Sequence, residues 1–61
     1  MMDDVPVGFA FSLAQNEKAL ALFAGLDDKT KKQLIRRARQ ISSKQEMRDY
    51  VANLQDHIPP Q

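Results

Sequence analysis

The stretch VPVGFAFSL, residues 5–13, decides the fold, because its pattern fits either a strand or a helix. Its large apolar side chains stand at every second position, which is typical of a strand with one buried face. A strand would leave a row of backbone donors and acceptors unpaired, and the chain offers no second strand-like segment to pair with them. A helix satisfies these groups internally and accommodates Pro6 in its first turn. We therefore favour a helix over residues 7–15, with an edge strand as the alternative.

The helical interpretation makes this segment apolar on two sides. At 100° per residue, Phe9 and Leu13 share one side, whereas Val7, Phe11 and Ala14 lie on the other. A chain of 61 residues buries only about 60% of its unfolded surface, so three further short helices are too few to cover both sides. We therefore predict that Val7, Phe11 and Ala14 bind a protein partner or a second copy of the chain.

Capping residues mark three further helices. Asn16 precedes a helix over 17–24, Asp27 precedes one over 28–40, and Ser43 forms a capping box with Glu46 before one over 44–56. Gly25 is expected in the left-handed conformation that closes a helix. The short connection before Ser43 predicts that the last two helices form an αα-hairpin.

These elements predict an all-α fold, a small bundle of four short helices about 7–15, 17–24, 28–40 and 44–56. The whole chain, residues 1–61, is expected to be a single domain with loose tails at 1–5 and 57–61. Apolar residues at helical spacing supply the predicted core. Its members are Leu13, Leu20, Phe23, Leu26, Leu34, Ile35, Ala38, Ile41, Met47, Tyr50, Val51 and Leu54.

The charges are unevenly distributed, although the net charge is only +1. Residues 29–48 hold eight of the nine basic residues. Within this segment, one side of the predicted helix 28–40 carries Lys29, Lys32, Arg36 and Arg39. Such a stripe could contact the phosphates of a nucleic acid, which is our alternative function. A solvated outer face explains the same pattern more simply, because cations near a helix C-terminus suit its dipole. An acidic protein partner is a third interpretation.

Several classes of function lack the residues that they need. The chain has no cysteine, which excludes disulfides and thiolate metal sites. His57 is the single histidine and is expected on the surface after the last helix, without a nucleophile or acid–base partner. We therefore predict a non-enzymatic protein with no catalytic residue, metal, cofactor or small-molecule substrate.

The location is predicted from the start of the chain and from its apolar runs. The start, MMDDV, is acidic where a signal peptide is basic. No run approaches the roughly 20 apolar residues of a membrane span. We expect a cytoplasmic protein with no membrane contact.

Two spaced motifs carry a resemblance to a known family. They stand at Ala19, Phe23 and Leu26, and then at Ile35, Ala38 and Arg39. This segment resembles the C-terminal helical segment of the bacterial YdeI/OmpD-associated (bacteriocin-protection) family, and the start GFAFSLAQNE is similar to small proteins of gut Firmicutes. The resemblance implies a bacterial protein with a helical fold and implies no catalytic motif.

Overall fold

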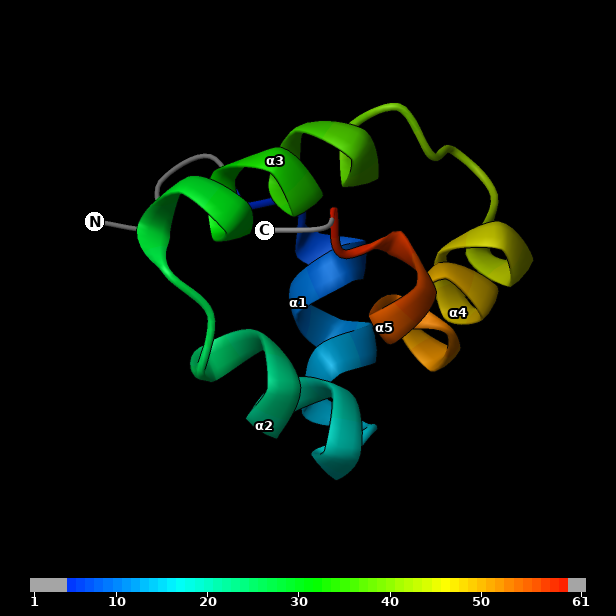
Figure 1. The fold of residues 1–61 in the computed structure, drawn as a ribbon. Helices are drawn as coiled ribbons and strands as arrows, with labels where there is room; N and C mark the ends of the chain where they lie inside the picture. Colours follow the sequence, from blue (N-terminus) through cyan, green and yellow to red (C-terminus); the bar gives the residue numbers. More distant parts are fainter. Residues whose placement is uncertain (1–4, 60–61) are drawn as a thin grey trace.

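The computed structural model describes residues 5–59 of the chain. These residues form helices and no strand (Figure 1), so the all-α prediction is confirmed and the edge-strand alternative is wrong. The helices are α1 (Val7–Ala14), α2 (Glu17–Ala24), α3 (Asp28–Ala38), α4 (Lys44–Ala52) and α5 (Leu54–His57).

Each of the first four helices begins where its sequence signal predicts. Pro6 stands just before α1, where its φ of −58° suits a helix start, and its carbonyl accepts the Ala10 N–H at 3.0 Å. The Asn16 side chain accepts the Ala19 N–H at 3.1 Å, and the Asp27 side chain accepts the Thr30 N–H at 3.3 Å.

The third predicted cap lies at the start of α4. The Ser43 hydroxyl oxygen accepts the Glu46 N–H at 3.3 Å. All three predicted side chains therefore satisfy a backbone donor that a helix start leaves without an internal partner.

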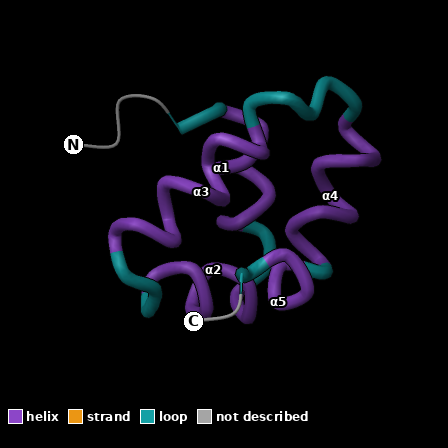
Figure 2. The backbone as a smooth tube through the Cα atoms, turned by 45° about the horizontal axis from the view of Figure 1, so that its top comes forward, coloured by secondary structure: helices purple, strands orange, loops and turns teal. Residues whose placement is uncertain are grey.

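Helix α1 lies at the centre of the fold. It packs most extensively against α4 and next against α2, while α3 crosses the molecule on another side (Figures 1 and 2). The Phe9 side chain is fully buried, and its ring lies 5.5 Å from the Phe23 ring and 5.8 Å from the Tyr50 ring. One aromatic side chain of α1 thus joins α2 to α4, although Phe9 is missing from the predicted core.

Most of the predicted core is buried, with one clear error at Leu20. That side chain is 44% exposed, because Ala19 occupies the core position one turn before Phe23 and leaves Leu20 about 100° further round α2. Leu26 and Ile41 are partly buried against the core. The buried residues are Phe9, Leu13, Ala19, Phe23, Thr30, Leu34, Ile35, Ala38, Met47, Tyr50, Val51 and Leu54.

The predicted helix 44–56 matches α4 up to Ala52, but the chain then turns at Asn53 and starts α5. The Asn53 side chain donates to the Asp49 carbonyl at 3.0 Å, and the Asn53 N–H donates to the same carbonyl at 3.0 Å. An unbroken helix would hold His57 about 10 Å along the axis from Tyr50. The turn instead brings the two rings to 4.7 Å, with His57 half-buried in the last turn of α5 rather than on the surface after it.

The predicted αα-hairpin between α3 and α4 is also wrong. Helix α3 ends at Ala38, two residues earlier than predicted, and the extended segment up to Ser43 carries the chain away before α4 begins (Figure 1). Helix α4 then packs along α1, because Met47 and Val51 enter the same core as Phe9. Its link to α3 is the Tyr50 hydroxyl, which donates to the Leu34 carbonyl at 2.8 Å.

Helix α2 does not end in a left-handed glycine. Gly25 has a φ of −83°, and its N–H bonds to the carbonyls of Ala21 and Leu22. The prediction for Gly25 is therefore wrong, since the backbone there is right-handed and is open to other residues.

The expected tails lie partly outside the described residues. Residues 1–4 and 60–61 are among those not described. Val5 and Ile58, which we expect in the tails, are partly buried against the core.

Candidate protein-interaction site

Helix α1 has two different sides in the structure. Phe9 and Leu13 are buried, whereas Val7 is 85% exposed and Phe11 is 62% exposed. Ala14 is exposed as well, so the three predicted partner-binding residues all reach solvent from the same helix. We call Val7, Phe11 and Ala14 the outer face of α1.

The outer face follows from how α1 is anchored. The rings around Phe9 hold the buried side of the helix against α2 and α4. At 100° per residue, Val7, Phe11 and Ala14 fall within about 60° of arc on the opposite side. Packing that buries Phe9 and Leu13 therefore turns the other apolar side chains outward.

The outer face carries no charge, because residues 5–16 contain no acidic or basic side chain. The next charged residues along the chain are Glu17 and Lys18, at the start of α2. An exposed phenylalanine and valine on an uncharged helix form a surface that gains free energy when another apolar surface covers it.

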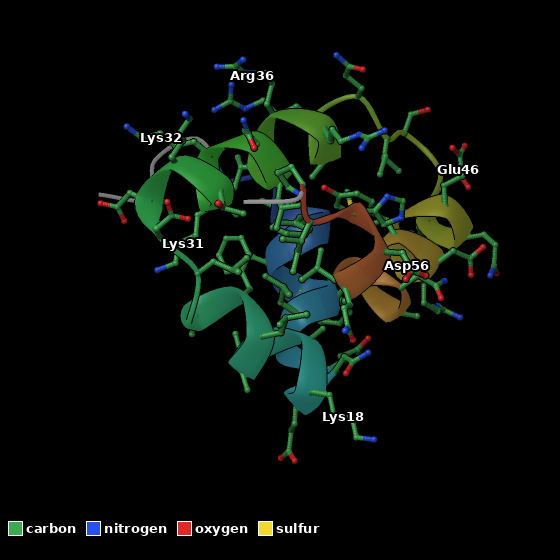
Figure 3. All side chains as sticks on the ribbon, viewed as in Figure 1. Lys18, Lys31, Lys32, Arg36, Glu46 and Asp56 are labelled. Atoms are coloured by element: carbon green, nitrogen blue, oxygen red, sulfur yellow. The ribbon has the colours of Figure 1, made fainter. Side chains whose placement is uncertain are left out.

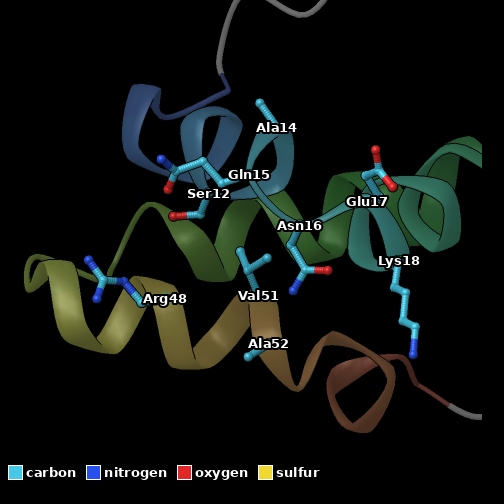
Figure 4. Close-up of a pocket in the computed structure, with 9 residues that line it drawn as sticks. All are labelled: Ser12, Ala14, Gln15, Asn16, Glu17, Lys18, Arg48, Val51 and Ala52. Atoms are coloured by element: carbon cyan, nitrogen blue, oxygen red, sulfur yellow. The ribbon is translucent and has the colours of Figure 1, made fainter.

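A hollow of about 620 Å³ lies beside the C-terminal end of α1, between that helix, the start of α2 and α4 (Figure 4). Val51 and Ala52 of α4 lie across from Ser12 of α1 and from Gln15, which directly follows that helix. Gln15 also lines this hollow and lies one helical turn after Phe11, since its N–H donates to the Phe11 carbonyl at 3.1 Å, so the hollow adjoins the outer face. The complete lining is Ser12, Ala14, Gln15, Asn16, Glu17, Lys18, Arg48, Val51 and Ala52.

No sequence pattern marks Lys18 or Arg48, the two cations of this hollow, as part of a site. They are 30 positions apart in the chain and line the same hollow only because α4 packs on α1. The sequence instead favours an αα-hairpin of α3 and α4, so it held no signal that would place Arg48 beside α1.

A second hollow, of about 470 Å³, lies between α3, α4 and α5. Arg37, Glu46 and Asp49 all line it, and the His57 ring lies 4.7 Å from the Tyr50 ring. Because both signs of charge line this hollow, it shows no preference for a ligand of one charge.

The basic stripe of α3 and its C-cap Arg39 lies on the surface. Figure 3 shows Lys32 and Arg36 projecting from the side of α3 that faces away from the other helices. The four predicted side chains, Lys29, Lys32, Arg36 and Arg39, are all exposed. By contrast, Lys31 lies over the Phe23 ring at 5.9 Å and helps to cover the core.

Among residues 5–59, the two ionisable side chains with clearly shifted pKa values have structural partners. Hydrogen bonding from Thr30 lowers the pKa of Asp27, which caps α3. Burial raises the pKa of Tyr50, against an opposing effect of Arg37, and its hydroxyl donates to Leu34. Both shifts arise from groups that hold helices in place.

Residues 5–59 hold neither a cluster of metal ligands nor a membrane-spanning helix. In this part of the chain, no three His, Cys, Asp or Glu side chains come together as metal ligands would. None of its helices combines the length and apolar character needed to cross a membrane.

No family model, curated protein or solved structure matches the chain. The resemblance to the YdeI/OmpD-associated family therefore stays a prediction.

Proposed function

We propose that the protein is a small, non-enzymatic, cytoplasmic interaction module that binds a protein partner, or a second copy of itself, through the outer face of α1. The observation that carries this proposal is the exposure of Phe11, at 62%, on a helix whose other side supplies the fully buried Phe9. Covering a phenylalanine and a valine removes apolar surface from water, at about 25 cal/mol for each Å².

The proposal is tested by two measurements on the wild type and on Phe11→Ser. Sedimentation equilibrium over a concentration series detects a second copy as partner. Selection from a displayed library of random peptides detects a surface that accepts another protein. Leu20→Ser is the matched control, because it removes an exposed apolar side chain from α2 and leaves α1 intact.

We expect self-association, peptide binding or both, lost in Phe11→Ser and kept in Leu20→Ser. A wild type that stays monomeric at every concentration and enriches no peptide over Phe11→Ser contradicts the proposal. Equal losses in both variants would also contradict it, because general stickiness would then explain the binding.

Nucleic-acid binding through α3 is the second candidate, favoured by the exposure of Lys29, Lys32 and Arg36 along the helix and of Arg39 at its C-cap. Binding through such a stripe falls steeply with salt, because each phosphate contact releases counterions. Titration of a mixed-sequence oligonucleotide at low salt, with Lys32→Glu/Arg36→Glu as the comparison, tests it. No change in fluorescence anisotropy on adding the wild type removes this candidate.

A further inference from the structure

The hollow beside α1 specifies the chemistry of the partner, an inference that rests on the proposed function. Its lining adjoins the outer face, because Gln15 lines the hollow one helical turn after Phe11. A partner segment that covers Phe11 and continues along α1 toward its C-terminal end therefore reaches the space above Val51 and Ala52.

The charges around this space are arranged to receive an anion. Arg48 lies at one end of the hollow and Lys18 at the other, with Val51 between them (Figure 4). Glu17, the single acidic residue of the lining, projects from the opposite side of the chain, away from α4. Two cations thus flank an apolar floor, and the nearest lining carboxylate is turned outward.

A second copy of the chain is a poor occupant of this surface. A stable interface buries about 800 Å² of each partner, which is roughly one sixth of the 4704 Å² exposed by this structure. Helix α1 has eight residues and so offers a face only about 12 Å long and one helix wide. Two convex helices that meet along such a face bury only a small part of the area that a stable interface needs. A partner segment that also enters the hollow buries more.

We propose that the outer face of α1 and the adjoining hollow bind an acidic, apolar segment of another protein. Apolar side chains of that segment cover Val7 and Phe11, and one of its Asp or Glu carboxylates lies in the hollow between Arg48 and Lys18. The carboxylate is attracted by both cations, and the Ser12 hydroxyl of the lining can donate a hydrogen bond to it.

The test extends the peptide selection to charge variants of the hollow. The same library is selected against the wild type and against Lys18→Glu/Arg48→Glu, with Arg36→Glu on α3 as the control for a general change in charge. Lys18, Arg36 and Arg48 are all exposed, so these variants keep the core intact, and far-UV circular dichroism checks this. One selected peptide is then measured with its Asp and Glu residues replaced by Asn and Gln.

We expect peptides selected by the wild type to combine large apolar residues with Asp or Glu. Replacing the acidic residue should weaken binding to the wild type roughly two- to fivefold, as for a partly exposed ion pair. The same replacement should not weaken binding to Lys18→Glu/Arg48→Glu, which should itself select Lys or Arg. Arg36→Glu should bind as the wild type does.

Three results would overturn the inference. In the first, the selected peptides lose binding in Phe11→Ser, yet show no preference for Asp or Glu and bind Lys18→Glu/Arg48→Glu as well as the wild type. That result would rule out an acidic partner and leave the proposed function standing. Acidic peptides lost in Arg36→Glu would place the site on α3. An absence of any peptide that depends on Phe11 would remove the proposed function and this inference together.

Discussion

The sharpest test of the two sides of α1 is the same substitution, phenylalanine to leucine, at Phe9 and at Phe11. The two residues lie on one helix and differ mainly in burial, since Phe9 is 0% exposed and Phe11 is 62% exposed. Phe9→Leu should destabilise the fold strongly, whereas Phe11→Leu should leave its stability almost unchanged.

The expected magnitudes follow from the contacts of each ring. Phe9 pairs with Phe23 at 5.5 Å and with Tyr50 at 5.8 Å, and each aromatic pair contributes about 0.5–1.5 kcal/mol beyond its buried area. Phe9→Leu should therefore cost about 1–3 kcal/mol. Phe11 is mostly solvated, so Phe11→Leu should stay within about 0.5 kcal/mol.

Leucine is the better replacement because alanine at position 9 would remove too much. Truncation of a buried phenylalanine to alanine costs about 3–5 kcal/mol. A domain of 61 residues has a total free energy of unfolding of about 3–9 kcal/mol. Phe9→Ala would therefore leave part of the protein unfolded in water, and no reliable stability could be extracted.

The assay is urea unfolding followed by circular dichroism, at two protein concentrations. Equal destabilisation by both substitutions would refute the two-sided description of α1, because Phe11 would then be as buried as Phe9 in solution. If the cost of Phe11→Leu appears only at the higher concentration, the burial comes from a second copy of the chain, which would contradict our choice of partner.

Three further predictions concern the supports of the fold, each measured by the same unfolding assay. Tyr50→Phe removes the hydroxyl that donates to the Leu34 carbonyl at 2.8 Å, and should lower the free energy of unfolding by about 0.5–1.5 kcal/mol. Because burial raises the pKa of Tyr50 above its usual 10.0, the unfolded tyrosine ionises first, and the wild type should lose stability as the pH rises above 10. Tyr50→Phe should lack this loss. Gly25→Ala should raise the free energy of unfolding by about 0.4–1 kcal/mol, because φ there is −83° and an added Cβ would lie 3.6 Å from the nearest oxygen, an ordinary contact. A loss of stability would show that the Gly25 backbone is left-handed in solution. Asn16→Ala should cost about 1 kcal/mol through the lost cap of α2, and no change would mean that the bond to Ala19 does not form.

Helix positions were predictable from the sequence because their determinants are local. The caps at Asn16, Asp27 and Ser43 each act on a backbone group three residues away. The choice between strand and helix at residues 5–13 was equally local, since an unpaired strand has no way to satisfy its backbone in so short a chain. Nothing distant in the sequence was needed for either conclusion.

The packing of the helices was less predictable because it depends on contacts between distant residues. The turn at Asn53 was missed because the apolar spacing from Met47 to Leu54 continues without interruption through it. Leu20 was misplaced because helical spacing alone does not tell whether Ala19 or its larger neighbour takes the core position. The hollow was missed for the same reason, since Lys18 and Arg48 meet it only through the packing of α4 on α1.

The fold itself gives no reason for the residue types on the outer face of α1. Phe9 and Leu13 already anchor the helix, and Pro6 and Asn16 bound it at either end. Glutamate, lysine or glutamine at position 11 would form the helix at least as well as phenylalanine, and each would lower the exposed apolar area. A side chain that is 62% exposed and contributes little to the stability of its own chain is explained more simply by contact with another molecule, and Phe11 is therefore the first position at which to look for one.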